Sequence, residues 1–270
     1  MGNPVEHSKS PWIHARFAAL TGEPVAYAKR LIALDEFPSA VRAFMAEGGR
    51  GCNITMPFKF QAASLVTRRS ARAALAEACN ILSFDGESIV GDNTDGIGLV
   101  ADLERNADVQ LPGLDILLLG GGGAAAGVLG PLVAARPRRI VVANRTVARA
   151  QSLVARHATI ADANAVELEA CGLDAISGSF DVILNGTASS LSGSDVPVRP
   201  QVLKPGALAY DMMYGPAAAG FLQWAREHGA VGRDGLGMLV EQAAEAFRLW
   251  RGIRPPSHQV LGELREELQR

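Results

Sequence analysis

The stretch that most constrains the fold is "DILLLGGGGAAAG", residues 115–127, where a short apolar run leads into four glycines and then into small residues. Continuous apolar runs of this length are typical of strands buried on both faces of a parallel sheet. The spacing Gly120-x-Gly122-x-x-Ala125 fits the fingerprint of a dinucleotide-binding turn, where glycines permit the tight turn and the close approach of a pyrophosphate. A helix beginning near Ala124 would direct free N–H groups at the phosphate oxygens. The stretch therefore predicts a strand, a turn and a helix that bind a dinucleotide.

The next apolar run indicates which dinucleotide is bound. "RRIVVANRTVARA" ends its apolar part at Asn144, about 20 residues after the glycines, where NAD enzymes usually carry an acidic residue for the ribose hydroxyls. Here Asn144, Arg145, Thr146 and Arg149 are found instead. A guanidinium can bind a 2′-phosphate through two hydrogen bonds, whereas a carboxylate would repel it. The pattern favours NADP over NAD. The alternative is that the two arginines lie at the start of a helix and bind no cofactor.

The order of the predicted elements indicates an α/β protein with two domains. Residues 96–235 alternate apolar runs with helical stretches, which predicts a doubly wound, Rossmann-type parallel sheet. We expect this nucleotide-binding domain to be inserted into an α/β substrate domain made of residues 1–95 and 236–270. The predicted strands are "DILLLG", "RIVVAN", "FDVILNG", "ALAYDMM" and residues 53–56, and the predicted helices are 10–20, 37–45, 59–67, 146–156, "GMLVEQAAEAFRLW" and 260–268.

Composition excludes several other classes of protein. The net charge of −2 gives no support for nucleic acid or an anionic membrane as a partner. Residues 116–135 carry no charge, but six glycines and Pro131 in this segment favour the strand and helix described above over a membrane span. The three cysteines are scattered, with no metal-like cluster, as expected of reduced thiols in the cytoplasm.

Polar side chains gather in two short segments of the first domain. "GCNITMPFK" carries Asn53, Thr55 and Lys59, which predicts a strand end that holds a small polar ligand, the alternative being an edge strand with a solvated face. "HSKSP" carries Ser8 and Ser10 two residues apart, so that in an extended chain both hydroxyls face the same way. The alternative for that segment is a loop in which Ser10 caps the following helix.

A third segment, "GDNTDG", supplies carboxylates that suit proton transfer. We expect Asp95 to face Lys59, because an ion pair in a site with little water can hold a proton for exchange with a reacting oxygen. The alternative is a turn built from the side chains of Asp92 and Asn93. His14 lies on a predicted helix and is expected in the protein core or at its boundary rather than at a ligand.

Taken in order, these segments resemble the shikimate dehydrogenase family over nearly the whole chain. The resemblance rests on "GNPVEHSKSP", "NITMPFK", "GDNTDG", "LGGGGA", "NRT" with Arg149, "YDMMYG" and "DGLGMLVEQAA". It implies a reversible NADPH-dependent reduction of 3-dehydroshikimate to shikimate, a cytoplasmic step toward chorismate and the aromatic amino acids. It also implies a small-molecule substrate as the partner of a monomer or homodimer.

The resemblance assigns roles to individual residues. Lys59 is implied as catalytic and paired with Asp95, although the sequence leaves open whether Lys59 donates the proton or orients another group. The implied substrate contacts are Ser8, Ser10, Asn53, Thr55, Asn80, Asp95, Tyr214 and Gln242. The implied NADP contacts are Gly120, Gly121, Gly122, Gly123, Ala124, Asn144, Arg145, Thr146, Arg149, Met212 and Gly235, with no metal.

Three departures from the family pattern are visible. The family carries a short apolar strand before "GNP", whereas here Met1 directly precedes Gly2. The glycine turn reads "GGGGA" where "GAGGA" is commoner, and "EACN" followed by Ile81 replaces the usual "GAVN" and Thr.

Three rival interpretations fit the sequence less well than this resemblance does. A quinate/shikimate dehydrogenase often has Thr near the second serine and Asp at the ribose position, so Ser10 and Asn144 argue against it. A methylenetetrahydrofolate dehydrogenase would lack the "SKSP" and "PFK" segments. A catalytically silent nucleotide sensor is disfavoured because Lys59 and Asp95 are both present.

Overall fold

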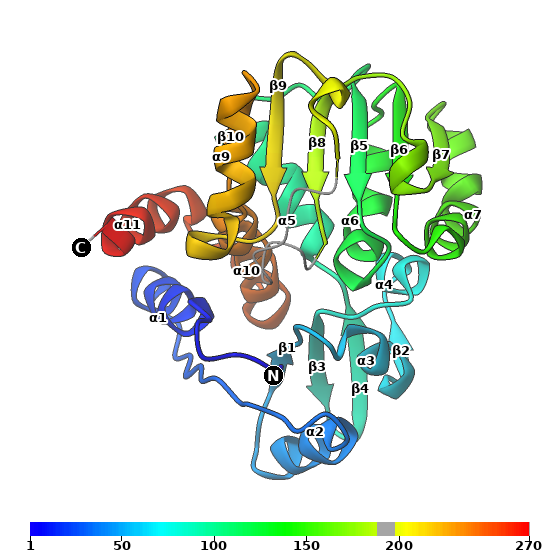
Figure 1. Cartoon of the computed structure of the whole chain (residues 1–270). Coiled ribbons are helices and arrows are strands. Elements are labelled where there is room, and N and C mark those ends of the chain that lie inside the picture. Colours follow the sequence, from blue (N-terminus) through cyan, green and yellow to red (C-terminus); the bar gives the residue numbers. More distant parts are fainter. Residues whose placement is uncertain (188–197, 270) are drawn as a thin grey trace. The chain divides into compact units, whose positions relative to one another are not determined.

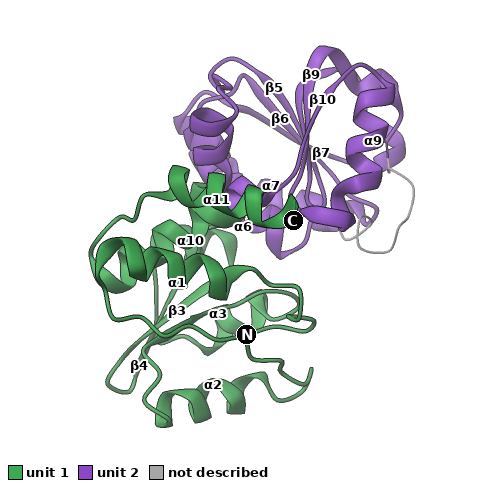
Figure 2. Cartoon of the chain, turned by 90° about the vertical axis from the view of Figure 1, so that its left-hand side faces the viewer, with its two compact units in different colours: residues 1–98, 239–270 green, residues 99–238 purple. Residues whose placement is uncertain are grey.

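The computed structural model describes residues 1–187 and 198–269 and divides the chain into two compact units. Unit 1 contains residues 1–98 and 239–270, and unit 2 contains residues 99–238 (Figure 2). Both divisions fall three residues after the predicted boundaries, inside helices α5 (Asp95–Ala101) and α10 (Leu236–Arg251). Unit 2 is thus an insertion in unit 1.

Unit 2 is built on a six-stranded sheet in which every neighbouring pair is parallel, in the order β10-β9-β8-β5-β6-β7 (Figure 1). This is the strand order of a doubly wound nucleotide-binding fold, so the predicted fold class is confirmed. The strands are β5 (Asp115–Leu119), β6 (Arg139–Ala143), β7 (Glu167–Cys171), β8 (Phe180–Asn185), β9 (Leu203–Asp211) and β10 (Val231–Arg233).

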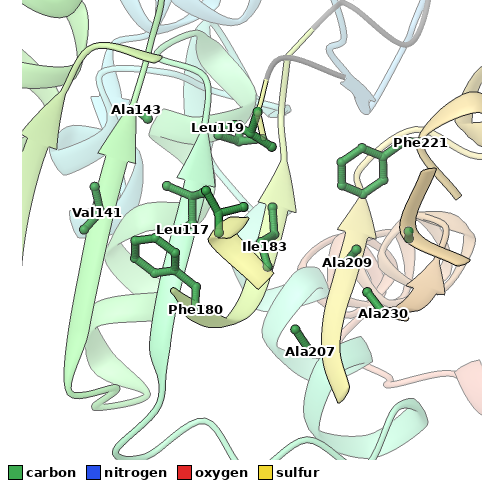
Figure 3. Close-up of a cluster of buried hydrophobic side chains, with 13 residues drawn as sticks. Leu117, Leu119, Val141, Ala143, Phe180, Ile183, Ala207, Ala209, Phe221 and Ala230 are labelled. Carbon is green, nitrogen blue, oxygen red and sulfur yellow. The ribbon is translucent and has the colours of Figure 1, made fainter. Parts of the chain in front are cut away.

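The four apolar runs are confirmed as the central strands β5, β6, β8 and β9, while β7 and β10 at the two edges were not predicted. An edge strand pairs on one side only and is less buried than a central strand. For this reason neither edge strand has an apolar run: β7 is the half-exposed "ELEAC" and β10 is the three-residue "VGR". Side chains of the central strands, such as Leu117 and Phe180, form a cluster of buried hydrophobic residues together with Phe221 of the helix α9 (Ala219–Glu227) (Figure 3).

Helices and short turns connect the strands of unit 2. Helix α7 (Val147–Ala163) begins one residue after the predicted start at Thr146 and extends beyond the predicted end at Arg156. The remaining elements are α6 (Gly123–Ala134), α9 (Ala219–Glu227), the π-helix η1 (Asp102–Asn106) and the 3-10 turns η2 (Leu173–Ala175), η3 (Pro200–Val202) and η4 (Gly215–Ala218). Within the described residues, no helix is both long enough and apolar enough to cross a membrane.

Unit 1 contains a four-stranded mixed sheet, in the order β1-β3-β4-β2, together with helices. Strands β1/β3 and β3/β4 are antiparallel, whereas β2 and β4 are parallel. The strands are β1 (Gly51–Asn53), β2 (Arg68–Arg69), β3 (Ile81–Asp85) and β4 (Ser88–Asp92), and the helices besides α5 and α10 are α1 (Ser10–Thr21), α2 (Phe37–Ala46), α3 (Lys59–Leu65), α4 (Ala71–Ala76) and α11 (Ser257–Gln269).

Two local predictions in unit 1 were wrong. The strand predicted over residues 53–56 ends at Asn53, and Met56 is 41% exposed, because the chain turns before Pro57 instead of continuing along the sheet. Ser10 is the first residue of α1 and not its cap; Lys9 takes the cap position, and the Ser10 N–H donates to the Ser8 hydroxyl.

Candidate active site

The ion pair predicted between Lys59 and Asp95 is present in unit 1. Lys59 is the first residue of α3, directly after the turn at Pro57, and Asp95 is the first residue of α5. The Lys59 Nζ lies 2.5 Å from the Asp95 Oδ2, and the two side chains are 15% and 6% exposed. An ammonium and a carboxylate so far removed from water interact more strongly than a surface pair. The arrangement places a transferable proton next to an acceptor.

Asn80 connects Asp95 with helix α10. Its Nδ2, which carries two hydrogens, lies within hydrogen-bond distance of three acceptors: the Asp95 Oδ1 (2.8 Å), the Thr94 Oγ1 (3.1 Å) and the Gln242 Oε1 (3.3 Å). Its Oδ1 accepts the backbone N–H of Thr94 at 2.8 Å. Asn80 is 2% exposed and Gln242 8% exposed, so this amide holds a buried carboxylate and a buried amide in fixed positions.

The loop between β4 and α5 fixes the orientation of Asp95. The Asn93 Oδ1 accepts the Asp95 N–H (3.1 Å), and the Asn93 Nδ2 donates to the carbonyl of Ala78 (2.9 Å). Arg72 binds both carboxylate oxygens of Asp92 at 2.7 and 2.8 Å. The turn given above as the alternative is therefore present, and it directs the Asp95 side chain toward Lys59.

Asn53 lies at the end of β1 and contacts a residue that the sequence did not single out. The Tyr27 hydroxyl donates to the Asn53 Oδ1 at 2.8 Å, and the Asn53 Nδ2 faces the carbonyl of Asn80 at 3.5 Å. The phenol oxygen also interacts with the Ser10 side chain. Tyr27 lies between α1 and α2 in a segment with no periodic pattern, so no sequence signal could have identified it. Through Tyr27, Ser10 and Asn53 belong to one polar group.

Two other predicted contacts of unit 1 occupy partly or fully exposed positions. Ser8 is half-buried and accepts a hydrogen bond from the Ser10 N–H, whereas Thr55 is exposed in the turn that follows β1.

His14 is fully buried, as predicted for a core residue, and stacks on Tyr27 with ring centroids 4.2 Å apart. Burial lowers the pKa of His14 to about 3, so the ring is neutral near pH 7.

The glycine turn of unit 2 has the backbone shape that a pyrophosphate requires. Gly120 has φ +115°, a conformation that side chains rarely allow, and a Cβ there would lie 3.1 Å from the carbonyl oxygen of Gly186. Gly122 is the cap residue of α6 and Gly123 its first residue, so the first N–H groups of α6, including that of Ala124, have no intrahelical partners. These features fit the binding of a dinucleotide.

The residues predicted to select the cofactor follow strand β6. The Asn144 Nδ2 donates to the Thr146 carbonyl at 2.8 Å, which shapes the start of α7. Arg145, Thr146 and Arg149 are exposed, and a Cβ added to Gly121 would lie 3.0 Å from the Cβ of Arg149. The Arg149 side chain thus begins beside the glycine turn, a position that suits the binding of a 2′-phosphate.

Three further predicted residues lie in unit 2, after β9 and β10. Met212 follows β9 and donates its N–H to the Asn185 carbonyl at 2.9 Å. A Cβ added to Gly235 would lie only 2.3 Å from the carbonyl oxygen of Met212, so the two backbones meet at a point where only glycine fits. Tyr214 lies two residues beyond Met212 and is half-buried.

Comparisons with known proteins all indicate one family. Three family models match the chain: the shikimate dehydrogenase substrate binding domain over residues 1–82, shikimate / quinate 5-dehydrogenase over residues 103–192, and the shikimate 5'-dehydrogenase C-terminal domain over residues 235–265. The chain is 64% identical over 265 residues to a shikimate dehydrogenase (NADP(+)) of Acidovorax sp. (strain JS42), covering 98% of this chain and 94% of that protein.

Solved structures show the same similarity. The crystal structure of an Ael1 enzyme from Pseudomonas putida is 44% identical with a TM-score of 0.87, covering 97% of this chain and 96% of that chain. Shikimate 5-dehydrogenase from Thermus thermophilus, in complex with NADP(H) and shikimate, is 27% identical with a TM-score of 0.83, covering 98% and 97% of the two chains. On its fold, its polar residues and these similarities, the chain belongs to the shikimate dehydrogenase family.

Proposed function

We propose that this chain catalyses the reversible NADPH-dependent reduction of 3-dehydroshikimate to shikimate. The observation that carries the proposal is the Lys59–Asp95 ion pair, because it joins a proton donor to a buried network of amides that suits a polyhydroxylated ligand. The relatives named as NADP-dependent shikimate dehydrogenases support the same reaction. Unit 1 then binds the substrate and unit 2 binds NADP.

In the direction of reduction, bound NADPH supplies a hydride to the carbonyl carbon of the substrate. The π electrons of the carbonyl move to its oxygen, which then needs a proton. Lys59 donates that proton, and Asp95 stabilises the ammonium before transfer and orients its N–H bonds. In the reverse direction, Lys59 accepts the proton from the hydroxyl group that is oxidised.

The other residues of unit 1 bind and orient the substrate. Asn53 and Gln242 offer amide groups, while Ser8, Ser10 and Thr55 offer hydroxyl groups. Asn80 is almost fully used by its contacts to Asp95, Thr94 and Gln242. It therefore orients the other side chains and offers little hydrogen-bonding capacity to the substrate. In unit 2, Tyr214 is assigned to the substrate by the family resemblance alone.

The NADP assignment rests on the glycine turn and the arginines of unit 2. The pyrophosphate would lie on Gly120, Gly121, Gly122, Gly123 and Ala124 at the N-terminus of α6. The 2′-phosphate would be bound by Asn144, Arg145, Thr146 and Arg149, and the nicotinamide half would lie near Met212 and Gly235. The proposal includes a small-molecule substrate as the partner, with neither nucleic acid nor a membrane bound. It also includes a cytoplasmic location and a monomer or homodimer.

The test is the nicotinamide absorbance during oxidation of shikimate. We expect turnover with NADP and a fall in kcat of at least about 100-fold for Lys59→Ala, with a much smaller change in KM, because Lys59 acts on the oxygen that changes charge. Lys204→Ala is the matched control: Lys204 also pairs with carboxylates, at 2.8 Å from Asp115 and 2.7 Å from Asp181, but near the start of strand β9 in unit 2. An unchanged kcat in Lys59→Ala would refute the role of Lys59, and turnover of quinate alone would refute the substrate.

A further inference from the structure

We infer that Tyr27 is a positioning residue, which fixes the orientation of the Asn53 side-chain amide so that an N–H bond of this amide is held ready for the substrate. The inference rests on the proposed function and specifies one part of the substrate site. Tyr27 has no part in the reaction derived above, and none of the motifs in the sequence includes it.

The argument begins with the two ends of the Asn53 amide. Asparagine has an acceptor oxygen and a donor NH₂ group of nearly the same shape, so its partners decide which end faces a ligand. The Tyr27 hydroxyl donates to the oxygen at 2.8 Å, and the carbonyl of Asn80 faces the nitrogen at 3.5 Å. The reverse orientation would bring two oxygens together at Asn80 and would leave the phenol proton without an acceptor.

The consequence concerns the chemistry of the ligand. With its oxygen bound to Tyr27, the Asn53 amide retains one N–H bond for a ligand, because the other is directed at Asn80. The group that this N–H binds carries an acceptor, such as a hydroxyl or carbonyl oxygen. Asn53 also has a fixed backbone position, because it pairs with Ile81 at the end of β1. Both the backbone and the side chain of Asn53 are thus set before the substrate binds.

Tyr27 can act in this way because its own ring is held on several sides. His14 stacks on it at 4.2 Å with an interplanar angle of 5°, and the Trp250 ring lies 6.4 Å away. The Ser10 side chain interacts with the phenol oxygen. Burial raises the pKa of the Tyr27 hydroxyl, so the hydroxyl remains a donor at physiological pH. Because the phenol is fixed, its hydroxyl determines which end of the Asn53 amide faces it.

The test is Tyr27→Phe, which keeps the stacked ring and removes only the hydroxyl. In the ligand-free protein we expect the side-chain NH₂ signals of Asn53, assigned by their absence in Asn53→Ala, to shift and broaden. By calorimetry without cofactor, the dissociation constant for shikimate should rise about tenfold, which corresponds to about 1.4 kcal/mol. In the full assay KM for shikimate should rise by a similar factor, while kcat stays within about threefold and KM for NADP is unchanged.

A double-mutant cycle separates positioning from a general loss of structure. If Tyr27 acts through Asn53, then Tyr27→Phe has no further effect in the Asn53→Ala background. Ser83→Ala is the matched control, because it removes the hydrogen bond of 3.0 Å from the Trp250 indole in the same unit without touching Asn53, and KM should not change. Additive losses in the cycle, or unaltered Asn53 signals in Tyr27→Phe, would overturn the inference. A wild-type protein that binds no shikimate would instead refute the proposed function, and the Asn53 signals would still decide the role of Tyr27.

Discussion

Replacement of His14 by phenylalanine should make the stability of the protein less sensitive to mild acid. His14 is fully buried against Phe17, Tyr27, Phe247 and Trp250, and neither of its ring nitrogens has a hydrogen-bond partner within the described residues. Burial lowers its pKa from 6.5 to about 3. In the unfolded chain the ring is solvated and titrates near its ordinary value.

The sign and the magnitude follow from proton linkage. Between pH 6.5 and pH 3 the unfolded state binds a proton at His14 that the folded state excludes, so acid favours unfolding. The stability that the neutral ring allows is complete above pH 6.5 and is lost as the pH falls toward 3. From pH 7 to pH 5 the loss is about 2 kcal/mol. Because the folded protein barely protonates His14 at pH 5, this value depends little on the folded pKa.

The assay is urea-induced unfolding of the wild type and His14→Phe at pH 7 and pH 5. We expect the free energy of unfolding to fall by about 2 kcal/mol more in the wild type than in the variant. Any change in packing caused by the larger ring is the same at both pH values and cancels in this comparison. His14→Leu serves as a second variant with a different shape. Parallel losses in all three proteins would show that His14 is already protonated or solvated in the folded state, and the reasoning would fail.

Two further predictions concern unit 2 and the helix that leaves it. Arg149→Ala should raise KM for NADP at least about tenfold and leave KM for NAD unchanged, because only NADP carries the 2′-phosphate, and equal effects on both cofactors would contradict this role. Gly237→Ala should lower the free energy of unfolding by about 2–4 kcal/mol, measured by thermal or urea unfolding. A Cβ there would lie 1.9 Å from Oδ1 of the buried Asp102. The Asp102 carboxylate accepts hydrogen bonds from Tyr210 and Arg233, so its displacement would disturb both. Gly262→Ala in α11 is the matched control, because a Cβ added there would have open space around it. This variant should raise the free energy of unfolding by up to about 1 kcal/mol. A similar loss of stability in both variants would refute the steric argument.

Tertiary contacts decided how the candidate site is assembled. Asn80 and Gln242 are 162 residues apart in the chain, and Tyr27 and Asn53 are 26 apart, yet each pair shares a hydrogen bond. No local pattern encodes such pairs, because they arise only when separate elements pack together. The family resemblance named Asn80 and Gln242 individually, but their mutual contact and the whole role of Tyr27 were visible only in the folded chain.

Local sequence patterns determined the fold class, most of the helices and the central strands of unit 2, but not β2, β3 and β4 of unit 1. The apolar runs at β5, β6, β8 and β9 and the glycine turn are recognisable because burial on both faces of a sheet and a positive φ each restrict the residue types at single positions. The edge strands β7 and β10 and the end of β1 escaped prediction, because pairing on one side or a turn into Pro57 leaves no periodic signature. The sequence thus determined which segments form the two units and which residues are candidates for the chemistry. Only the tertiary structure decided which side chains touch, because hydrogen-bond geometry depends on distances that chain order does not specify.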